Sequence, residues 1–85
     1  MEVTMSRKNG ESIQVRIGLR IKELRNQRGL SQEKLAMRAE LDRTYINSVE
    51  NGKRNISINS LARIADALGH TLQDFFKSDL FGTKE

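Results

Sequence analysis

The fold of this chain is decided by residues 30–52, LSQEKLAMRAELDRTYINSVENG. Ser31 and Asp42 in this stretch are strong N-cap residues, because their short side-chain oxygens can accept hydrogen bonds from the free N–H groups of a first helical turn. Apolar side chains follow each cap at helical spacing, and Gly52 is the kind of residue that ends a helix. The stretch therefore predicts two short helices joined at a sharp angle through residues 40–42.

Two longer helices are predicted on either side of this pair. In residues 12–28, isoleucine and leucine recur every three or four positions and form one apolar face. The basic side chains of Arg16, Arg20 and Lys22 are expected to lie off that face. Residues 57–69 carry a broad apolar face between a serine N-cap and a glycine, which predicts the second of these helices.

A last helix is expected to begin at Thr71, whose spacing from the next aspartate resembles a capping box. Its apolar stripe consists of Leu72, Phe75, Phe76 and Leu80. With it, the chain is predicted to be all-α, a compact five-helix bundle that spans residues 12–79. Residues 1–11 are expected to form a flexible arm, and residues 80–85 a C-terminal tail that frays from Phe81 onward.

Composition limits the class of protein. A chain of 85 residues makes one small domain, and the absence of cysteine excludes disulfides and thiolate metal sites. No apolar stretch approaches the roughly 20 residues of a membrane span, and the N-terminus lacks an apolar signal segment. We therefore expect a cytoplasmic protein without a membrane partner.

The net charge of the chain is +4, and the positive charge is concentrated around the two short helices. Residues 13–56 carry ten basic and five acidic side chains, a net charge of +5, whereas residues 57–85 have a net charge of −1. This distribution favours a polyanionic partner such as nucleic acid. A solvated helical surface of mixed charge is the alternative interpretation.

Several spaced motifs resemble the Cro/repressor (XRE-like) type of helix-turn-helix DNA-binding domain. They are LR at 24–25, GLSQ at 29–32, LA at 35–36, Ile46, VENGK at 49–53 and LARIADAL at 61–68. The resemblance covers roughly residues 13–77 and implies a lambda-repressor-like fold and a transcriptional regulator that binds specific sequences of double-stranded DNA. Glu40 stands where the family often has glycine, and a left-handed conformation there costs a non-glycine residue about 1 kcal/mol, so either Glu40 accepts that strain or the turn differs locally.

A narrower resemblance is to the controller proteins of restriction-modification systems. It rests on LDRTYI at 41–46 and NGKRNIS at 51–57. Such proteins are small homodimers that regulate the restriction gene, and often their own promoter, by binding paired operators. Two other kinds of protein stay open on the same resemblance: antitoxins, which bind a toxin and often their own promoter, and generic phage-like repressors.

The second of the two short helices carries the candidate base contacts. A recognition helix enters the major groove with the residues of its N-terminal end at the base edges. Arg43 can bind O6 and N7 of guanine with two N–H groups, and Thr44 can hydrogen bond or place its methyl group against thymine. The full set of predicted base contacts is Arg43, Thr44, Asn47 and Ser48.

Phosphate contacts are expected from the helix ends and from basic neighbours. Gln32, at the start of the first short helix, can place its amide and its backbone N–H against a phosphate, helped by the helix dipole. The other predicted phosphate contacts are Tyr45, Asn51, Lys53, Arg54, Asn55 and Ser57. A solvated basic turn is the alternative for Lys53 and Arg54.

Arg25 and Glu50 match a family pair that bridges the first helix to the end of the recognition helix, and they are predicted to form a structural ion pair rather than to contact DNA. The last helix is richer in large apolar side chains than a small monomer needs. We therefore expect a homodimer whose two recognition helices lie about 34 Å apart on a palindromic operator. The predicted dimer contacts are Phe75, Phe76, Leu80 and Phe81.

Catalysis finds no support in the sequence, and the protein is not expected to be an enzyme. His70 is the single histidine, so one chain has neither a His-paired nucleophile nor a His-rich metal site. No metal, cofactor or small-molecule substrate is predicted. A regulator that activates transcription would also contact RNA polymerase, but no set of residues identifies such a surface.

Overall fold

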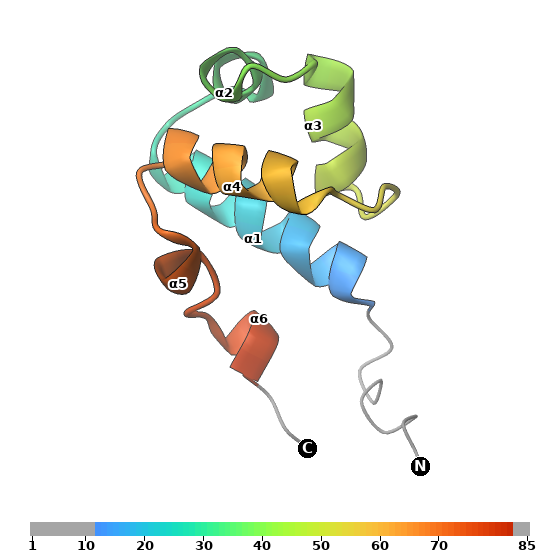
Figure 1. Cartoon of the computed structure of the whole chain (residues 1–85), viewed down its shortest axis with the longest axis vertical. Coiled ribbons are helices and arrows are strands. Elements are labelled where there is room, and N and C mark those ends of the chain that lie inside the picture. Colours follow the sequence, from blue (N-terminus) through green and yellow to red (C-terminus); the bar gives the residue numbers. More distant parts are fainter. Residues whose placement is uncertain (1–11, 83–85) are drawn as a thin grey trace.

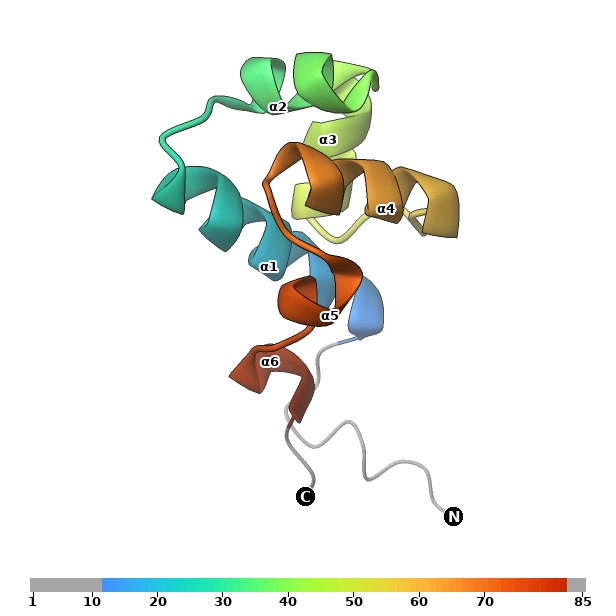
Figure 2. The same cartoon turned by 60° about the vertical axis from the view of Figure 1, so that its left-hand side comes forward.

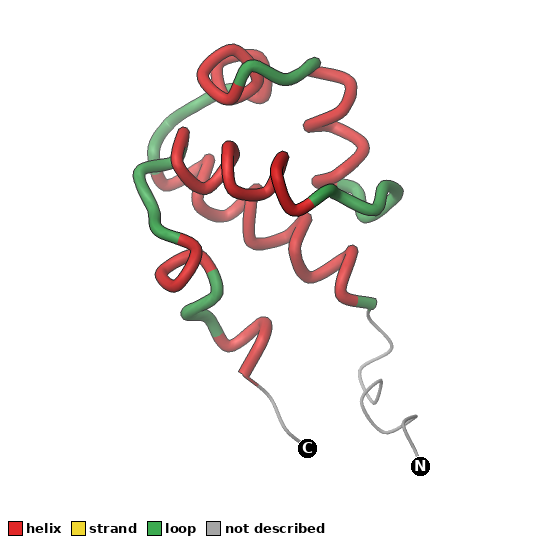
Figure 3. Tube along the Cα trace, viewed as in Figure 1, coloured by secondary structure: helices red, strands yellow, loops and turns green. Residues whose placement is uncertain are grey.

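Six helices make up residues 12–82, the part of the chain that the structure, a computed structural model, describes. They are α1 (Ile13–Gln27), α2 (Gln32–Ala39), α3 (Arg43–Glu50), α4 (Ile58–Ala67), α5 (Leu72–Phe75) and α6 (Asp79–Gly82). Over this range short loops join the helices and no strand is present (Figure 3), so the predicted all-α class is confirmed. The arm predicted for residues 1–11 and the last three residues of the predicted tail lie outside the described residues.

The helices α2 and α3 lie at one end of the molecule and α5 and α6 at the other, with α1 and α4 between them (Figure 1). The same arrangement holds in the view turned by 60° (Figure 2). Among the described residues, no helix is both long and apolar enough to cross a membrane.

Most of the helices begin at the predicted caps. The side chains of Ser31, Ser57 and Thr71 each accept a hydrogen bond from the backbone N–H three residues on, at 3.0–3.1 Å. Asp42 occupies the N-cap position of α3 in an extended conformation, but its side chain makes no capping hydrogen bond. The prediction of a strong cap at Asp42 is therefore wrong in its chemistry, although α3 begins where it was expected.

One core holds the helices together, and it draws on α1 to α5. The buried apolar side chains are Ile17, Ile21, Leu24, Leu35, Ala36, Ala39, Ile46, Val49, Leu61, Ile64, Ala65, Leu68 and Phe75. Leu30, Leu41, Tyr45, Ile56, Ala67 and Phe81 are partly buried against it. Because α2 and α3 contribute inward residues to the same core as α1, their orientation is set by the domain as a whole.

The close approach of α1 and α3 depends on Gly18. A Cβ atom at this buried position would collide with the carbonyl oxygen of Val49 and would lie 2.8 Å from that of Glu50. Glycine in the middle of a helix costs up to about 1 kcal/mol relative to alanine. Here it lets the C-terminal end of α3 rest on the backbone of α1.

The turn between α2 and α3 passes through Glu40, which adopts the left-handed conformation with φ 58° and ψ 46°. The turn therefore has the geometry that glycine provides in the family, and Glu40 accepts the strain. Its N–H bonds the carbonyl of Met37, and the next N–H, that of Leu41, bonds the carbonyl of Ala36. These bonds close the end of α2 and direct the chain into α3.

The C-terminal region differs from the single last helix that the apolar stripe predicts. The chain forms α5, leaves the helix at residues 76–78 and forms α6. At this break the N–H groups of Lys77 and Ser78 bond the carbonyls of Asp74 and Phe76 instead of those four residues back. Arg20 donates to the carbonyl oxygens of Asp74, Phe75 and Lys77 and so stabilises the non-helical segment. Arg20 is 8% exposed, so the expectation that it lies away from the core is also wrong.

The helix α6 includes residues that were assigned to the tail. Its range crosses the boundary predicted between residues 79 and 80, and Phe81 is helical and partly buried against the core rather than frayed. Arg16 of α1 donates to the carbonyl oxygen of Leu80 at 3.3 Å. Two arginine side chains of α1 therefore stabilise the C-terminal helices by donating hydrogen bonds to backbone carbonyl oxygens of that region.

Candidate nucleic-acid interface

The helix α3 has one face in the core and one in solvent. Ile46, Val49 and Glu50 are buried, whereas Arg43, Thr44 and Asn47 are exposed and Ser48 is half-buried. Arg43, Asn47 and Asn51 are spaced four residues apart, so they form one stripe along the helix. All four predicted base contacts are therefore accessible on α3.

Predicted phosphate contacts border this face. Gln32 begins α2 and is half-buried, and the loop that follows α3 carries exposed Asn51, Lys53, Arg54, Asn55 and Ser57. The structure brings part of this loop onto α3: the Arg54 guanidinium lies 4.8 Å from the centre of the Tyr45 ring, and the Tyr45 hydroxyl accepts a hydrogen bond from the Ser57 N–H at 3.4 Å. Tyr45 is thus a support for the basic loop as well as a candidate phosphate contact.

Arg25 and Glu50 form a two-pronged ion pair between α1 and the end of α3. Arg25 Nε lies 2.7 Å from one carboxylate oxygen and Nη2 lies 3.0 Å from the other. The Arg25 and Glu50 side chains are 11% and 2% exposed, and Nη1 also donates to the carbonyl of Leu30. Hydrogen bonding to Glu50 raises the pKa of the Arg25 guanidinium, burial lowers it and the attraction of the carboxylate raises it again.

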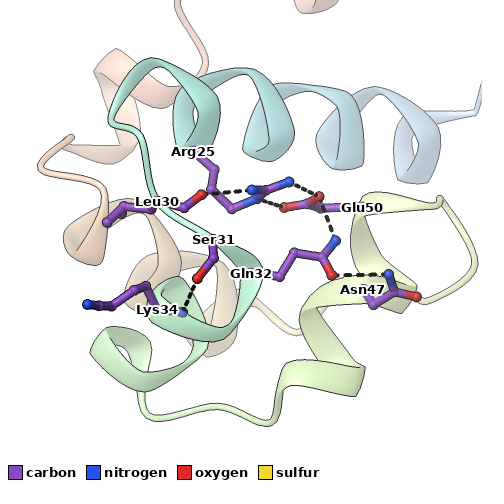
Figure 4. Close-up of polar contacts among 7 residues, drawn as sticks. All are labelled: Arg25, Leu30, Ser31, Gln32, Lys34, Asn47 and Glu50. Carbon is purple, nitrogen blue, oxygen red and sulfur yellow. Dashed lines mark hydrogen bonds and ion pairs between the residues drawn. The ribbon is translucent and has the colours of Figure 1, made fainter.

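The ion pair continues into a chain of side-chain amides that reaches the solvent face (Figure 4). Gln32 Nε2 donates to Glu50 at 3.0 Å, and Asn47 Nδ2 donates to Gln32 Oε1 at 3.1 Å. Asn51 Nδ2 then donates to Asn47 Oδ1 at 3.2 Å. Sequence reasoning missed these links, although the spacing of four between Asn47 and Asn51 is a signal for the last one.

The charge count overstates the basic surface, because three of the arginines in residues 13–56 are used inside the fold. Arg20 is buried, and Arg16 and Arg25 are half-buried with carbonyl or carboxylate partners. On α3 and the loop after it the exposed basic side chains are Arg43, Lys53 and Arg54, and α2 adds exposed Lys34 and Arg38. The exposed positive charge of this region therefore lies on α2, on α3 and on the loop after α3.

The predicted dimer residues fall into two groups. Phe75 is fully buried in the core of its own chain, so the assignment of Phe75 to a dimer surface is wrong. Phe76 is 37% exposed and packs edge to face on Phe81, with ring centres 4.9 Å apart. Leu80 is half-buried, and Leu72 is exposed beside them. The apolar surface that remains for a partner consists of Leu72, Phe76, Leu80 and Phe81.

In residues 12–82 no group of three or more histidine, cysteine, aspartate or glutamate side chains is placed to hold a metal ion. The single histidine, His70, lies with Nδ1 3.1 Å from the carbonyl oxygen of Leu68. The exposed face of α3 and the loop after it instead carry hydrogen-bonding and basic side chains.

Comparison with known proteins identifies the family to which this arrangement of helices belongs. A helix-turn-helix family profile matches residues 21–75, which contain α2, the turn at Glu40 and α3. The chain belongs to the helix-turn-helix family. Control protein C.MunI from Mycoplasma sp. is 48% identical over 65 residues, which are 75% of this chain and 88% of the relative.

Solved structures of similar helix-turn-helix proteins agree with this assignment. The restriction-modification controller protein C.AhdI from Aeromonas hydrophila has a TM-score of 0.74 and 41% identity, covering 78% of this chain and all of that one. The C.Esp1396I controller protein tetramer in complex with its natural 35-base-pair operator has a TM-score of 0.75 and 38% identity, covering 79% and 90%. This chain is thus similar to these three proteins over nearly their whole length.

Proposed function

We propose that this chain is a transcriptional regulator that binds a palindromic operator as a homodimer. In this proposal it controls restriction-modification genes and its own promoter. The observation that carries the proposal is the exposed face of α3, which presents Arg43, Thr44 and Asn47 while its other face is fixed in the core. The similarity to control proteins supports the choice of regulated genes. The solved operator complex of C.Esp1396I supports DNA as the partner.

In this mechanism α3 enters the major groove of B-DNA. Arg43, the first residue of the helix, binds a guanine with two N–H groups, and Thr44 contacts the neighbouring base. These contacts supply sequence preference, because each base pair shows a distinct pattern of donors and acceptors in that groove.

The borders of α3 position the helix on the duplex. The N-terminal end of α2 directs backbone N–H groups at one phosphate, and Lys53 and Arg54 bind others on the far side of α3. Such contacts are independent of sequence, and each one makes binding more sensitive to salt.

Dimerisation doubles the contact area with DNA. The helices α5 and α6, whose segment carries the apolar surface of Leu72, Phe76, Leu80 and Phe81, lie at the end of the molecule opposite to α2 and α3 (Figure 1). Joining two copies there leaves both α3 helices exposed, and in this proposal they bind half-sites one helical turn apart. The protein acts in this proposal by binding and not as an enzyme.

Selection of bound DNA from a random pool at about 0.15 M salt tests this function. The proposal predicts enrichment of a palindrome whose half-site centres lie about 34–36 Å, or roughly one helical turn, apart. Enrichment of an asymmetric sequence would contradict the homodimer, and the absence of enrichment would contradict sequence-specific binding.

A further inference from the structure

Asn47 is exposed, but its side-chain amide is hydrogen-bonded to two other side chains, Gln32 and Asn51. Its nitrogen donates to Gln32 Oε1 and its oxygen accepts from Asn51 Nδ2, at 3.1 and 3.2 Å. Figure 4 shows the Asn47 nitrogen on the side of Gln32 and the oxygen away from it. The side chain therefore already has a fixed place before DNA binds.

Glu50 determines the donor and the acceptor in each hydrogen bond of this series of amides. A carboxylate that is ion-paired with Arg25 only accepts hydrogen bonds, so Gln32 has to direct its NH₂ group at Glu50. That leaves the Gln32 oxygen facing Asn47, which has to direct its own NH₂ group back. The Asn47 oxygen then faces Asn51. A buried acceptor on α3 thus determines which end of an exposed amide is the donor.

We propose that Asn47 reads one adenine in each half-site, and that Gln32 is the positioning residue that fixes its amide in the orientation required. This inference rests on the proposed function. Adenine presents N7 as an acceptor and the N6 amino group as a donor in the major groove, and an asparagine amide matches that pair with its N–H and its oxygen. An asparagine amide has two N–H groups and two lone pairs on its oxygen, so one of each stays available for the base.

Fixing the orientation sharpens the base preference. A free amide can turn over and exchange its donor and acceptor ends, so it tolerates other base patterns. An amide held between Gln32 and Asn51 offers one pattern only. The second N–H of Gln32 is still available for the phosphate contact proposed for this residue.

The test compares base preferences, position by position, for the wild-type chain and for Asn47→Ala, Gln32→Met and the double variant, using DNA selected from a random pool. Asn47→Ala is expected to reduce the preference for adenine at one position of each half-site by roughly 5- to 150-fold. Gln32→Met is expected to reduce the preference at the same position. The double variant is expected to equal Asn47→Ala there, because Gln32 acts on that base only through Asn47.

Two further variants keep the test independent of folding. Gln32→Lys still donates to Glu50 but offers no acceptor to Asn47, so it is expected to relax the same position with the Arg25–Glu50 pair intact. Gln73→Met, on the exposed surface of α5, is the matched control and is expected to leave every position unchanged. Thermal unfolding of each variant verifies that it is folded at the temperature of selection.

The possible outcomes distinguish a failure of this inference from a failure of the proposed function. If the wild-type chain enriches a palindrome but Gln32→Met and Gln32→Lys leave the Asn47 position unchanged, the inference is wrong and the function stands. The same holds if Gln32 variants weaken all sequences equally, which is the result of a lost phosphate contact alone, or if Asn47→Ala alters no position. A wild-type chain that enriches no sequence refutes both.

Discussion

Arg20 Nε donates a hydrogen bond of 2.6 Å to the carbonyl oxygen of Phe75, joining the middle of α1 to the end of α5. Arg20 Nη2 adds the carbonyl oxygens of Asp74 and Lys77 at 3.0 and 3.3 Å. The buried Arg20 guanidinium thus fixes the backbone of residues 74–77, the segment that carries the exposed Phe76. The basic residues of α1 that the charge pattern associates with DNA serve in part to place the proposed dimer surface.

Arg20→Met is expected to lower the free energy of unfolding by about 3 kcal/mol, because the carbonyl oxygens of Phe75 and Lys77 lose their Arg20 donor, the first of them in a buried hydrogen bond. It is also expected to weaken dimerisation, since α5 and α6 lose their fixed position. Denaturant unfolding and sedimentation equilibrium measure the two effects. Lys22→Met, an exposed change on the same helix, is the control, and an Arg20→Met protein as stable as this control would contradict the prediction.

Gly18→Ala is expected to destabilise the fold by about 1–3 kcal/mol or more, because the added methyl group meets backbone carbonyl oxygens of α3 that cannot move away alone. Alanine would otherwise favour a helix. Gly82→Ala in α6, where an added Cβ has no atom within 4 Å, is the matched control. Thermal unfolding distinguishes the two, and equal midpoints would show that the close approach of α1 and α3 is not needed.

Glu50→Ala is expected to cost about 3–5 kcal/mol of stability, since it leaves the Arg25 guanidinium partly buried without its carboxylate. DNA binding should fall as a consequence, because Gln32 loses its acceptor as well. Exposed Glu33→Ala on α2 provides the comparison. An unchanged unfolding midpoint for Glu50→Ala would rule out its role as a brace.

Arg43→Ala and Lys53→Ala are expected to weaken binding in different ways. Loss of Arg43 should relax the preference for one guanine per half-site by about 1–3 kcal/mol, whereas loss of Lys53 should weaken all sequences alike and reduce the salt slope by about 1. Fluorescence titrations at several salt concentrations, with a matched and a single-base-changed duplex, measure both. A uniform loss for Arg43→Ala would place that side chain on a phosphate instead of a base.

Local rules were sufficient to predict the helix boundaries at Ser31, Ser57 and Thr71, because a cap depends on a few neighbouring residues. The left-handed turn at Glu40 is one of the two possibilities that the family pattern left open, and the side chain of Glu40 does not indicate it. Exposure of Arg43 and Thr44 followed from the helical period of α3.

Long-range partners were beyond the sequence. Arg20 looks like any basic residue off an apolar face, and only the folded chain shows three carbonyl oxygens, more than 50 positions away, within its reach. The stripe of apolar residues predicted one last helix, since periodicity does not register the hydrogen bonds that Arg20 makes to carbonyl oxygens at the end of α5. For the same reason the sequence could not separate buried Phe75 from exposed Phe76.

Equilibrium binding of the full chain to the selected palindrome and to a scrambled duplex, at about 0.15 M salt, measures whether the protein binds a specific operator as a dimer. We expect two chains on each palindrome and an affinity at least about a thousandfold higher than for the scrambled duplex. Equal affinity for the two duplexes, or one chain bound per palindrome, would contradict this expectation.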